Sequence, residues 1–258
     1  MTERTFVSQS TGPVVLGLDL PVGSIQVQVL RNVTTARVVL RTADASGPAA
    51  DAVNRARTGQ NSQAMSVEVP EMPGNVMVQS VRGNRVTQTM GTVYGSVTGM
   101  TIINGRIVTG GGTDTMTTVS PIEAIICLPV GSSLAVVSQS ADAKVNGDLE
   151  RMEFRSTSGD LEIDGARHLN ASTTSGDIVA RLLSERVTAR SVSGDISVDL
   201  YSGADADLNT TSGDVDVAAT SQASGALRAN TVSGDVKVTG AGALRVSARS
   251  VSGRVRTR

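Results

Sequence analysis

The chain has 258 residues, enough for one large domain or two ordinary ones, and a formal net charge of −1. Aromatic residues make up only 2% and tryptophan is absent, although 39% of the residues are hydrophobic. We therefore expect a core of small aliphatic side chains between closely spaced sheets. The balanced charge argues against a nucleic-acid-binding protein, and the single cysteine, Cys127, excludes an internal disulfide framework. Since no signal segment or apolar run of membrane-spanning length is present, we expect a cytoplasmic chain without a membrane span.

Residues 1–72 are predicted to form a β-rich unit with one short helix. Alternating apolar residues indicate strands at Val14–Leu20, Arg37–Arg41 and Met65–Val69. The alanine-rich stretch Pro48–Thr58 favours the helix.

A proline-glycine pentapeptide occurs twice and links the two halves of the chain. Leu20–Ser24 reads Leu-Pro-Val-Gly-Ser and precedes an alternating run, and Leu128–Ser132 repeats the same five residues before another. Each copy is predicted to be a turn that leads into a strand.

Residues 73–120 have a different composition, rich in glycine, threonine, valine and methionine. Gly91, Gly95 and Gly99 recur every four residues, and Gly110–Gly112 follow. This segment is either an insert of short hairpins or a mobile loop, and the sequence does not decide between the two.

Residues 121–258 contain an internal repeat, which is predicted to be an all-β solenoid continuous with the N-terminal unit. The triplet Ser-Gly-Asp recurs with an alternating apolar run on each side, and its last copy reads Ser-Gly-Arg. The triplets begin at Ser158, Ser175, Ser193, Ser212, Ser233 and Ser252, after a degenerate copy at Ser140. Steps of 17 to 21 residues predict coils of about 19 residues: a strand, a tight Ser-Gly-Asp turn, a second strand and a looser turn of variable length.

The chemistry of the triplet suits a tight turn. Glycine tolerates a positive φ, and serine and aspartate oxygens can accept hydrogen bonds from nearby backbone N–H groups. Stacked coils would pair each strand with its copies above and below. A meander of antiparallel hairpins is the alternative, although it explains the repeat of the whole unit less well.

These motifs resemble the bacterial "putative adhesin" family, a domain of unknown function numbered 4097, whose members repeat a Ser-Gly-Asp coil after Leu-Pro-x-Gly-Ser. The similarity is strong over Ile122–Arg258 and weak over Val14–Val69. The resemblance implies a β-solenoid that is often membrane-linked or exported, with no established catalytic residues.

The repeated aspartates are the most chemical-looking feature of the sequence. We expect each to accept a hydrogen bond from the backbone of its own turn, while a ladder of bound cations is the alternative. These residues are Asp142, Asp160, Asp177, Asp195, Asp214 and Asp235. The glycine-rich nonapeptide of calcium-binding solenoids is missing, and valines interrupt the threonines before the triplet, which disfavours an ice-binding array.

Signs of catalysis are sparse, and we expect neither an enzyme nor a cofactor. His168 is predicted to be an exposed residue in a turn, and Cys127 a small buried hydrophobic residue of a strand. The sequence has no phosphate-binding loop, dinucleotide fingerprint or zinc-ligand spacing.

Charge is distributed unevenly along the repeats. Between Asp142 and Asp216 there are 15 acidic and 7 basic residues, whereas from Lys237 onward there are six basic residues and no acidic one. The terminal cluster Arg245, Arg249, Arg254, Arg256 and Arg258 is therefore a candidate interaction surface. It either prevents end-to-end strand pairing or docks on an acidic partner, which could be another copy of the chain.

The sequence favours a non-catalytic scaffold or protein-interaction module that self-associates or binds a protein partner. Peripheral contact with an anionic surface is a further option, whereas nucleic acid is not expected. The alternatives are a polymer-acting hydrolase or lyase on a solenoid scaffold, and an envelope-associated adhesin or stress-sensing component anchored by a partner.

Overall fold

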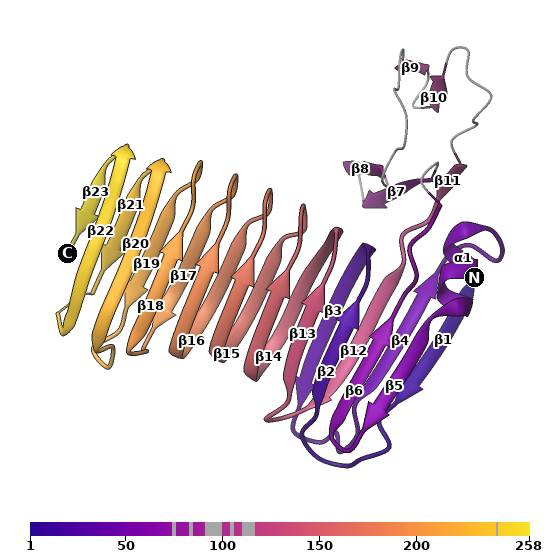
Figure 1. Cartoon of the computed structure of the whole chain (residues 1–258), viewed down its shortest axis with the longest axis horizontal. Helices are drawn as coiled ribbons and strands as arrows, with labels where there is room; N and C mark the ends of the chain where they lie inside the picture. Colours follow the sequence, from indigo (N-terminus) through magenta and orange to yellow (C-terminus); the bar gives the residue numbers. More distant parts are fainter. Residues whose placement is uncertain (74–75, 83–84, 91–99, 104–105, 110–116, 241) are drawn as a thin grey trace.

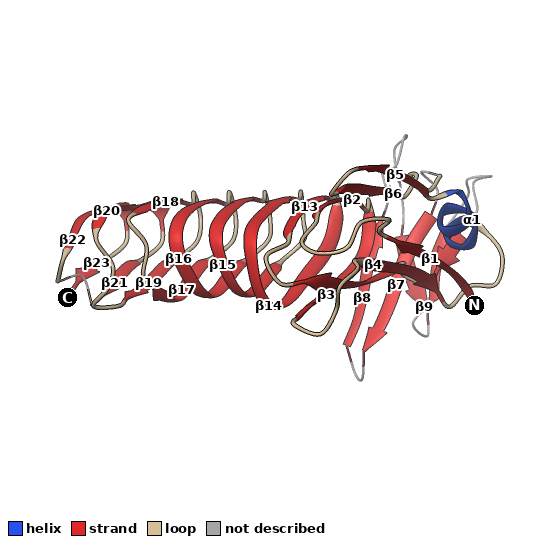
Figure 2. Cartoon of the chain, turned by 90° about the horizontal axis from the view of Figure 1, so that it is seen from below, coloured by secondary structure: helices blue, strands red, loops and turns tan. Residues whose placement is uncertain are grey.

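Two facing layers of mostly parallel strands form a flattened, rod-like solenoid in the computed structural model of the chain (Figures 1 and 2). The structure describes residues 1–73, 76–82, 85–90, 100–103, 106–109, 117–240 and 242–258. The all-β solenoid predicted from the repeat is thus confirmed.

The first layer begins with β5 and β6 and ends with β22 at the C-terminal end of the rod. Its strands in spatial order are β5 (Arg57–Asn61), β6 (Ala64–Glu68), β2 (Val15–Asp19), β13 (Ser133–Val137), the second halves of β14 (Ser140–Arg155), β15 (Leu161–Ser172) and β16 (Ile178–Arg190), then β18 (Asp205–Asn209), β20 (Gly225–Ser233) and β22 (Leu244–Ser252).

The second layer begins with β1 and ends with β23. Its strands are β1 (Thr2–Val7), β4 (Arg37–Thr42), β12 (Glu123–Pro129), β3 (Val22–Leu30), the first halves of β14, β15 and β16, then β17 (Ile196–Tyr201), β19 (Val215–Ala219), β21 (Val236–Thr239) and β23 (Val255–Thr257).

Successive coils stack in parallel register, as the repeat predicts. Leu161 lies beside Ile178, which lies beside Ile196, and that row continues to Val255 through Val215 and Val236. The antiparallel meander is therefore wrong for the repeat region.

The spread of 17 to 21 residues is absorbed at one corner of the coil, as expected. At the Ser-Gly-Asp corner, the number of residues between the two layers is constant. Five residues lie between Arg155 of the first layer and Leu161 of the second, and the same five-residue spacing recurs in every later coil up to Arg249 and Val255. At the opposite corner β14, β15 and β16 run through without a break, whereas three, five and four residues link β17–β18, β19–β20 and β21–β22.

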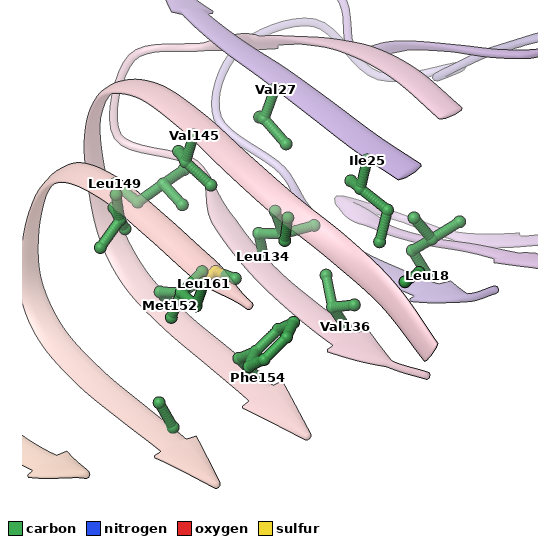
Figure 3. Packing of buried hydrophobic residues seen from close by; sticks show 14 of the residues in the cluster. Leu18, Ile25, Val27, Leu134, Val136, Val145, Leu149, Met152, Phe154 and Leu161 are labelled. Atoms are coloured by element: carbon green, nitrogen blue, oxygen red, sulfur yellow. The ribbon is translucent and has the colours of Figure 1, made fainter. Parts of the chain in front are cut away.

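Inward-facing side chains of both layers fill the interior between them, and in Figure 3 the side chains of Val136, Met152 and Phe154 point into it. Phe154 and Tyr201 are fully buried, while almost all other core residues are aliphatic. Burial alternates along the strands, for example in β18, because one face of each strand points inward.

The N-terminal strands belong to the same two layers. β3 lies between β12 and β14, and β2 lies between β6 and β13. The first Leu-Pro-Val-Gly-Ser copy leads from β2 into β3, and the second leads from β12 into β13. The boundaries at residues 72 and 120 stay a prediction.

Helix α1 (Pro48–Arg55) closes the N-terminal end of the rod, within the stretch where the sequence favours a helix. Pro48 begins the helix, and Ala49, Ala52 and Val53 are buried. Arg4 of β1 donates hydrogen bonds to the carbonyls of Asn54 and Ala56 at the helix C-terminus, at 2.6 and 2.7 Å.

The segment 73–120 contributes five short strands, of which β9 (Met100–Ile103) and β10 (Arg106–Thr109) lie farthest from the rod (Figure 1), while Val76, Val78 and Val119 of β7 (Val76–Arg82) and β11 (Thr117–Val119) belong to the buried core. β7 pairs with β8 (Arg85–Met90) and β11, and β9 pairs with β10. Both Gly91–Gly99 and Gly110–Gly112 lie outside the described residues.

Candidate functional site

The glycine of each Ser-Gly-Asp corner is required by close backbone contact between coils. A Cβ atom on Gly194 would lie 2.0 Å from the carbonyl oxygen of Gly176, and one on Gly213 would lie 2.2 Å from that of Gly194. None of the triplet glycines has a positive φ. The expectation that these glycines serve a left-handed conformation is therefore wrong, because it is the space for a Cβ that is missing.

A hydroxyl two residues before the triplet serine holds the corner from inside. The Thr210 hydroxyl donates to the carbonyl of Gly194 at 2.9 Å, and the Thr231 hydroxyl donates to that of Gly213 at 2.9 Å. Both threonines are buried. Ser191 and Ser250 make the same contact in their coils.

The serines of the triplet itself do not close the corner, contrary to expectation. All five from Ser158 to Ser233 are exposed. Within the described residues, none of these five hydroxyls makes a side-chain hydrogen bond.

The aspartates of the triplet bind the next coil rather than their own turn, which corrects the expected pairing. The backbone N–H of Asp195 donates to the Asp177 carboxylate at 2.8 Å, and that of Asp214 donates to the Asp195 carboxylate at 2.7 Å. The same bond continues at the end of the row, where Arg254 N–H donates to Asp235 at 2.8 Å. Each carboxylate thus bridges two coils.

The row of aspartates carries uncompensated negative charge. No ion pair of the described residues includes any of the six aspartates from Asp142 to Asp235. Burial is the main cause that raises the pKa of the Asp160 carboxyl, and repulsion from Asp142 and Asp177 also raises it. The hydrogen bond from the Asp177 N–H opposes this rise in pKa. Across the described part of the chain, no three carboxylate, imidazole or thiol side chains are grouped closely enough to hold a metal ion.

The terminal arginines lie on the last strand of each layer. Arg245 and Arg249 are on β22, Arg256 is on β23, and Arg254 and Arg258 flank β23. All five are exposed. None has an ion-pair partner among the described residues.

The corner opposite the triplets carries a charged cluster that spans three coils. Arg167 pairs with Glu185 and, at 3.3 Å, with Glu150, and His168 Nε2 lies 3.1 Å from Glu185. The hydrogen bond from Arg167 lowers the pKa of Glu185. His168 is therefore a partly covered strand residue of β15, not the exposed turn residue expected from the sequence.

Cys127 also differs from its prediction. It lies on β12 with its side chain on the outward, half-buried face, whereas its neighbours Ile126 and Leu128 are buried. In the sequence, Ile125 is as apolar as Ile126, so the apolar pattern does not reveal which residues face inward.

A family model described as Toastrack DUF4097 matches residues 50–258, which is most of the chain. The chain belongs to this family. The match extends upstream of the Ser-Gly-Asp repeats, so the Toastrack region includes most of α1 and the segment 73–120. A search of curated proteins finds no match.

Solved structures resemble the chain at low sequence identity. A "putative adhesin" from Bacteroides fragilis NCTC 9343 has a TM-score of 0.51 and 12% identity, over 100% of this chain and 97% of that one. A "putative lipid binding protein" from Parabacteroides distasonis ATCC 8503 has a TM-score of 0.41 and 11% identity, over 100% and 97%. A "putative cell adhesion protein" from Clostridium sporogenes ATCC 15579 has a TM-score of 0.41 and 9% identity, over 100% of this chain and 99% of that one. The first of these supports the fold.

None of the helices in the described residues has the length and apolar character that crossing a membrane requires.

Proposed function

We propose that this Toastrack chain is a non-catalytic protein-interaction module that docks an acidic protein surface on its terminal coil. The docking surface consists of Arg245, Arg249, Arg254, Arg256 and Arg258 with the outer edges of β22 and β23. This proposal gives the interaction role a defined place on the solenoid.

The observation that carries the proposal is a contrast in ion pairing along the rod. In the preceding coils, cations of the described residues are mostly paired with carboxylates of a neighbouring coil, as Lys144 is with Glu162 and Arg186 with Asp205. Lys237, just before the terminal coil, is paired with Asp216 at 2.7 Å. From Arg245 onward, no described cation is paired, so these charges are available to a partner.

The terminal coil offers backbone and apolar contacts beside its charges. In the described chain, β22 and β23 pair on one side only, with β20 and β21. Val251 is 82% exposed and Val255 44% exposed. An acidic partner could therefore combine ion pairs, strand pairing and some apolar burial, which together suit a specific interface.

The terminal coil departs from the repeat in its own residues. Arg254 replaces the aspartate of the triplet, and Thr257 stands where earlier coils place an inward apolar residue such as Val238. Atypical composition is common in the last repeat of a solenoid. A purely protective role for these charges, against end-to-end pairing, predicts no affinity for an acidic partner, so binding measurements separate the two explanations.

Two alternative functions are each supported by one specific observation. A polymer-acting enzyme would need a charged cluster, and the group of Arg167, His168 and Glu185 is the candidate for it. An adhesin role is suggested by the name of the Bacteroides fragilis "putative adhesin", which shares the fold.

The test uses a fluorescent poly-glutamate peptide as probe, titrated at low and high salt. The charge-reversal variant combines Arg254→Glu, Arg256→Glu and Arg258→Glu, and we expect it to weaken binding at least about tenfold, since each ion pair removed from a partly desolvated surface reduces affinity. The matched control reverses three exposed cations near the capped end.

The control combines Arg31→Glu, Arg37→Glu and Arg57→Glu, which are exposed and unpaired within the described residues. It should bind within about twofold of the wild type, because its substitutions lie outside the docking surface. Net charge changes equally in both variants, so bulk charge alone cannot cause a difference between them. Equal loss in both variants, or no binding of the probe by the wild type, would overturn the proposal.

A further inference from the structure

The Ser-Gly-Asp corner separates two parallel rows of opposite character. The residue three positions before each triplet serine lies on the first layer, in register with the same position of the next coil. The row is Arg155, Ser172, Arg190, Asn209, Asn230 and Arg249, which we name the donor row. It contains no acidic residue. Across the corner, five positions along the chain, runs the aspartate row from Asp142 to Asp235.

A row of β-branched side chains forms the tip of the corner between them. Its members are Thr157, Thr174, Val192, Thr211, Val232 and Val251, and all of them are exposed. Val192 is 47% and Val232 49% exposed. We name this the methyl row. Its methyl groups are not in the core and, apart from that of Val251, are not explained by the terminal docking surface.

We propose that the Ser-Gly-Asp corner is a self-association surface, on which a second copy of the chain packs side by side with its solenoid axis parallel to the first. The proposal rests on the proposed function in that the chain is an interaction module, and it adds a second surface and a second partner. A two-fold axis parallel to the rods would relate the copies.

This symmetry makes the corner complementary to itself. Rotation by 180° about an axis parallel to the rods exchanges the two layers across the interface. From Arg155 to Asn230 the donor row of one copy then faces the aspartate row of the other, and the two methyl rows meet along the axis. In the antiparallel arrangement, with the axis perpendicular to both layers, like rows would face each other, and aspartate would oppose aspartate.

The periodicity of the rows identifies the partner as another copy. All three rows advance by one coil, so their residues are spaced by about 4.8 Å, the distance between neighbouring strands. A second copy has the same spacing and brings the same residue types in the same order. A simple polyanion would match the donor row, but the aspartate row beside it would repel that ligand.

The expected association is weak. Six coils give a strip about 30 Å long, so the buried area lies on the order of 500 Å² per copy, which is below that of a stable dimer. Arg155 has no ion-pair partner in the described chain, whereas Arg190 lies 3.6 Å from Asp207. We therefore expect a salt-sensitive dimer that forms at high protein concentration.

The first experiment is oxidative cross-linking of single-cysteine variants on a Cys127→Ser background, with oxidised glutathione as the oxidant. Val192→Cys and Val232→Cys should each form a disulfide-linked homodimer, because a residue near the two-fold axis meets its own copy at the same height. The control is Val179→Cys, whose valine is 39% exposed on β16 within the outer face of the second layer. We expect it to cross-link at least about tenfold more slowly, since no interface raises its effective concentration.

Mixing the two variants tests the orientation of the rods. Val192 and Val232 lie two coils apart along the rod, about 10 Å, which exceeds the reach of a disulfide. A mixed dimer should therefore form much more slowly than either homodimer. Equal rates for mixed dimers and homodimers, or equal rates for all variants including Val179→Cys, would overturn the proposal.

Sedimentation equilibrium separates this surface from the terminal one. Arg155→Glu with Val192→Lys should weaken self-association at least about fivefold, because it places like charges and a buried ammonium in the contact. The variant Arg254→Glu, Arg256→Glu, Arg258→Glu should self-associate at least as strongly as the wild type, since Arg254 of one copy would face Arg249 of the other. Loss of self-association in the terminal variant alone would assign the contact to the rod end and overturn the corner interface, while a failed poly-glutamate titration would leave the corner interface unaffected.

Discussion

At the Ser-Gly-Asp corner every coil of the repeat has the same five-residue turn, whereas at the opposite corner the turns of neighbouring coils differ in length and in side-chain contacts. The first corner is held by backbone carbonyls that approach glycine, by buried hydroxyls and by aspartates that bridge coils. The opposite corner is held by individual contacts, such as Arg167 with Glu185 and the buried ring of Tyr201. Backbone contacts demand one residue type in every coil, while side-chain contacts allow the sequence and the loop length to vary.

The largest expected effect comes from the glycine of the regular corner. In Gly194→Ala the new Cβ would lie 2.0 Å from the carbonyl of Gly176, so the two coils must separate. We expect the free energy of unfolding to fall by more than about 3 kcal/mol, measured by denaturant unfolding followed by circular dichroism.

Gly17→Ala is the matched control on a first-layer strand. Its nearest atoms, the Met65 oxygen and the Ser66 Cβ, would lie 4.0 Å away. The free energy of unfolding should change by less than about 1 kcal/mol. Similar losses in both variants would mean that strand glycines in general, rather than the close approach of coils, limit stability.

The second prediction concerns Tyr201, which belongs to the opposite corner. Burial raises the pKa of its phenol to about 12, and its hydroxyl donates to the Glu185 carbonyl at 3.3 Å. Between pH 10 and 12 the folded chain keeps a proton that the unfolded chain loses, so the free energy of unfolding should decrease with rising pH, by on the order of 2 kcal/mol in total.

Tyr201→Phe should remove this dependence. Unfolding of both proteins is measured from pH 8 to 12, and the difference between them should be constant up to about pH 10 and then shrink or reverse. A parallel decline of both curves above pH 10 would show that other groups govern the alkaline transition.

The third prediction addresses the aspartate bridges of the regular corner. Asp195→Ala removes the acceptor of the Asp214 N–H, and because this site is exposed, water compensates in part. We expect a loss of about 1–2 kcal/mol, whereas Asp195→Asn keeps an oxygen at the acceptor position and should lose less than about 0.5 kcal/mol. Both are measured by denaturant unfolding, and equal losses would make the charge rather than the hydrogen bond decisive.

The sequence predicted the regular corner better than the irregular one, for a physical reason. Each triplet contact recurs with the period of the coil, so the repeat reveals that Gly194 and Asp195 matter, although it does not reveal that the glycine meets a carbonyl or that the carboxylate crosses to the next coil. Those facts depend on how coils stack. The buried hydroxyls of Thr210 and Thr231 could have been found, because serine or threonine stands two residues before every triplet.

Non-periodic contacts left no comparable signal. The partners Arg167 and Glu185 come from different coils at positions without counterparts in later coils, and the placement of β3 between β12 and β14 depends on pairing over about 100 residues of sequence. For the same reason the terminal arginines were found as a cluster of charge, while the donor row was not recognised. Its members share a face only once the strands are in register.

The smallest effect is expected at the opposite corner, in Arg167→Gln. Glu185 is partly exposed, and the hydrogen bond from Arg167 is the main cause of its lowered pKa, so the variant should move that pKa back toward the ordinary value of a glutamate. In the wild type, the stabilising contribution of this pair is present above the ordinary glutamate pKa and decreases as pH falls through the lowered one. NMR titration of the Glu185 side chain measures the shift directly, with Glu162 as the internal reference. If Glu185 kept its lowered pKa without Arg167, the remaining partner, His168, would account for the shift. The imidazole rather than the guanidinium would then be the main partner of the Glu185 carboxylate.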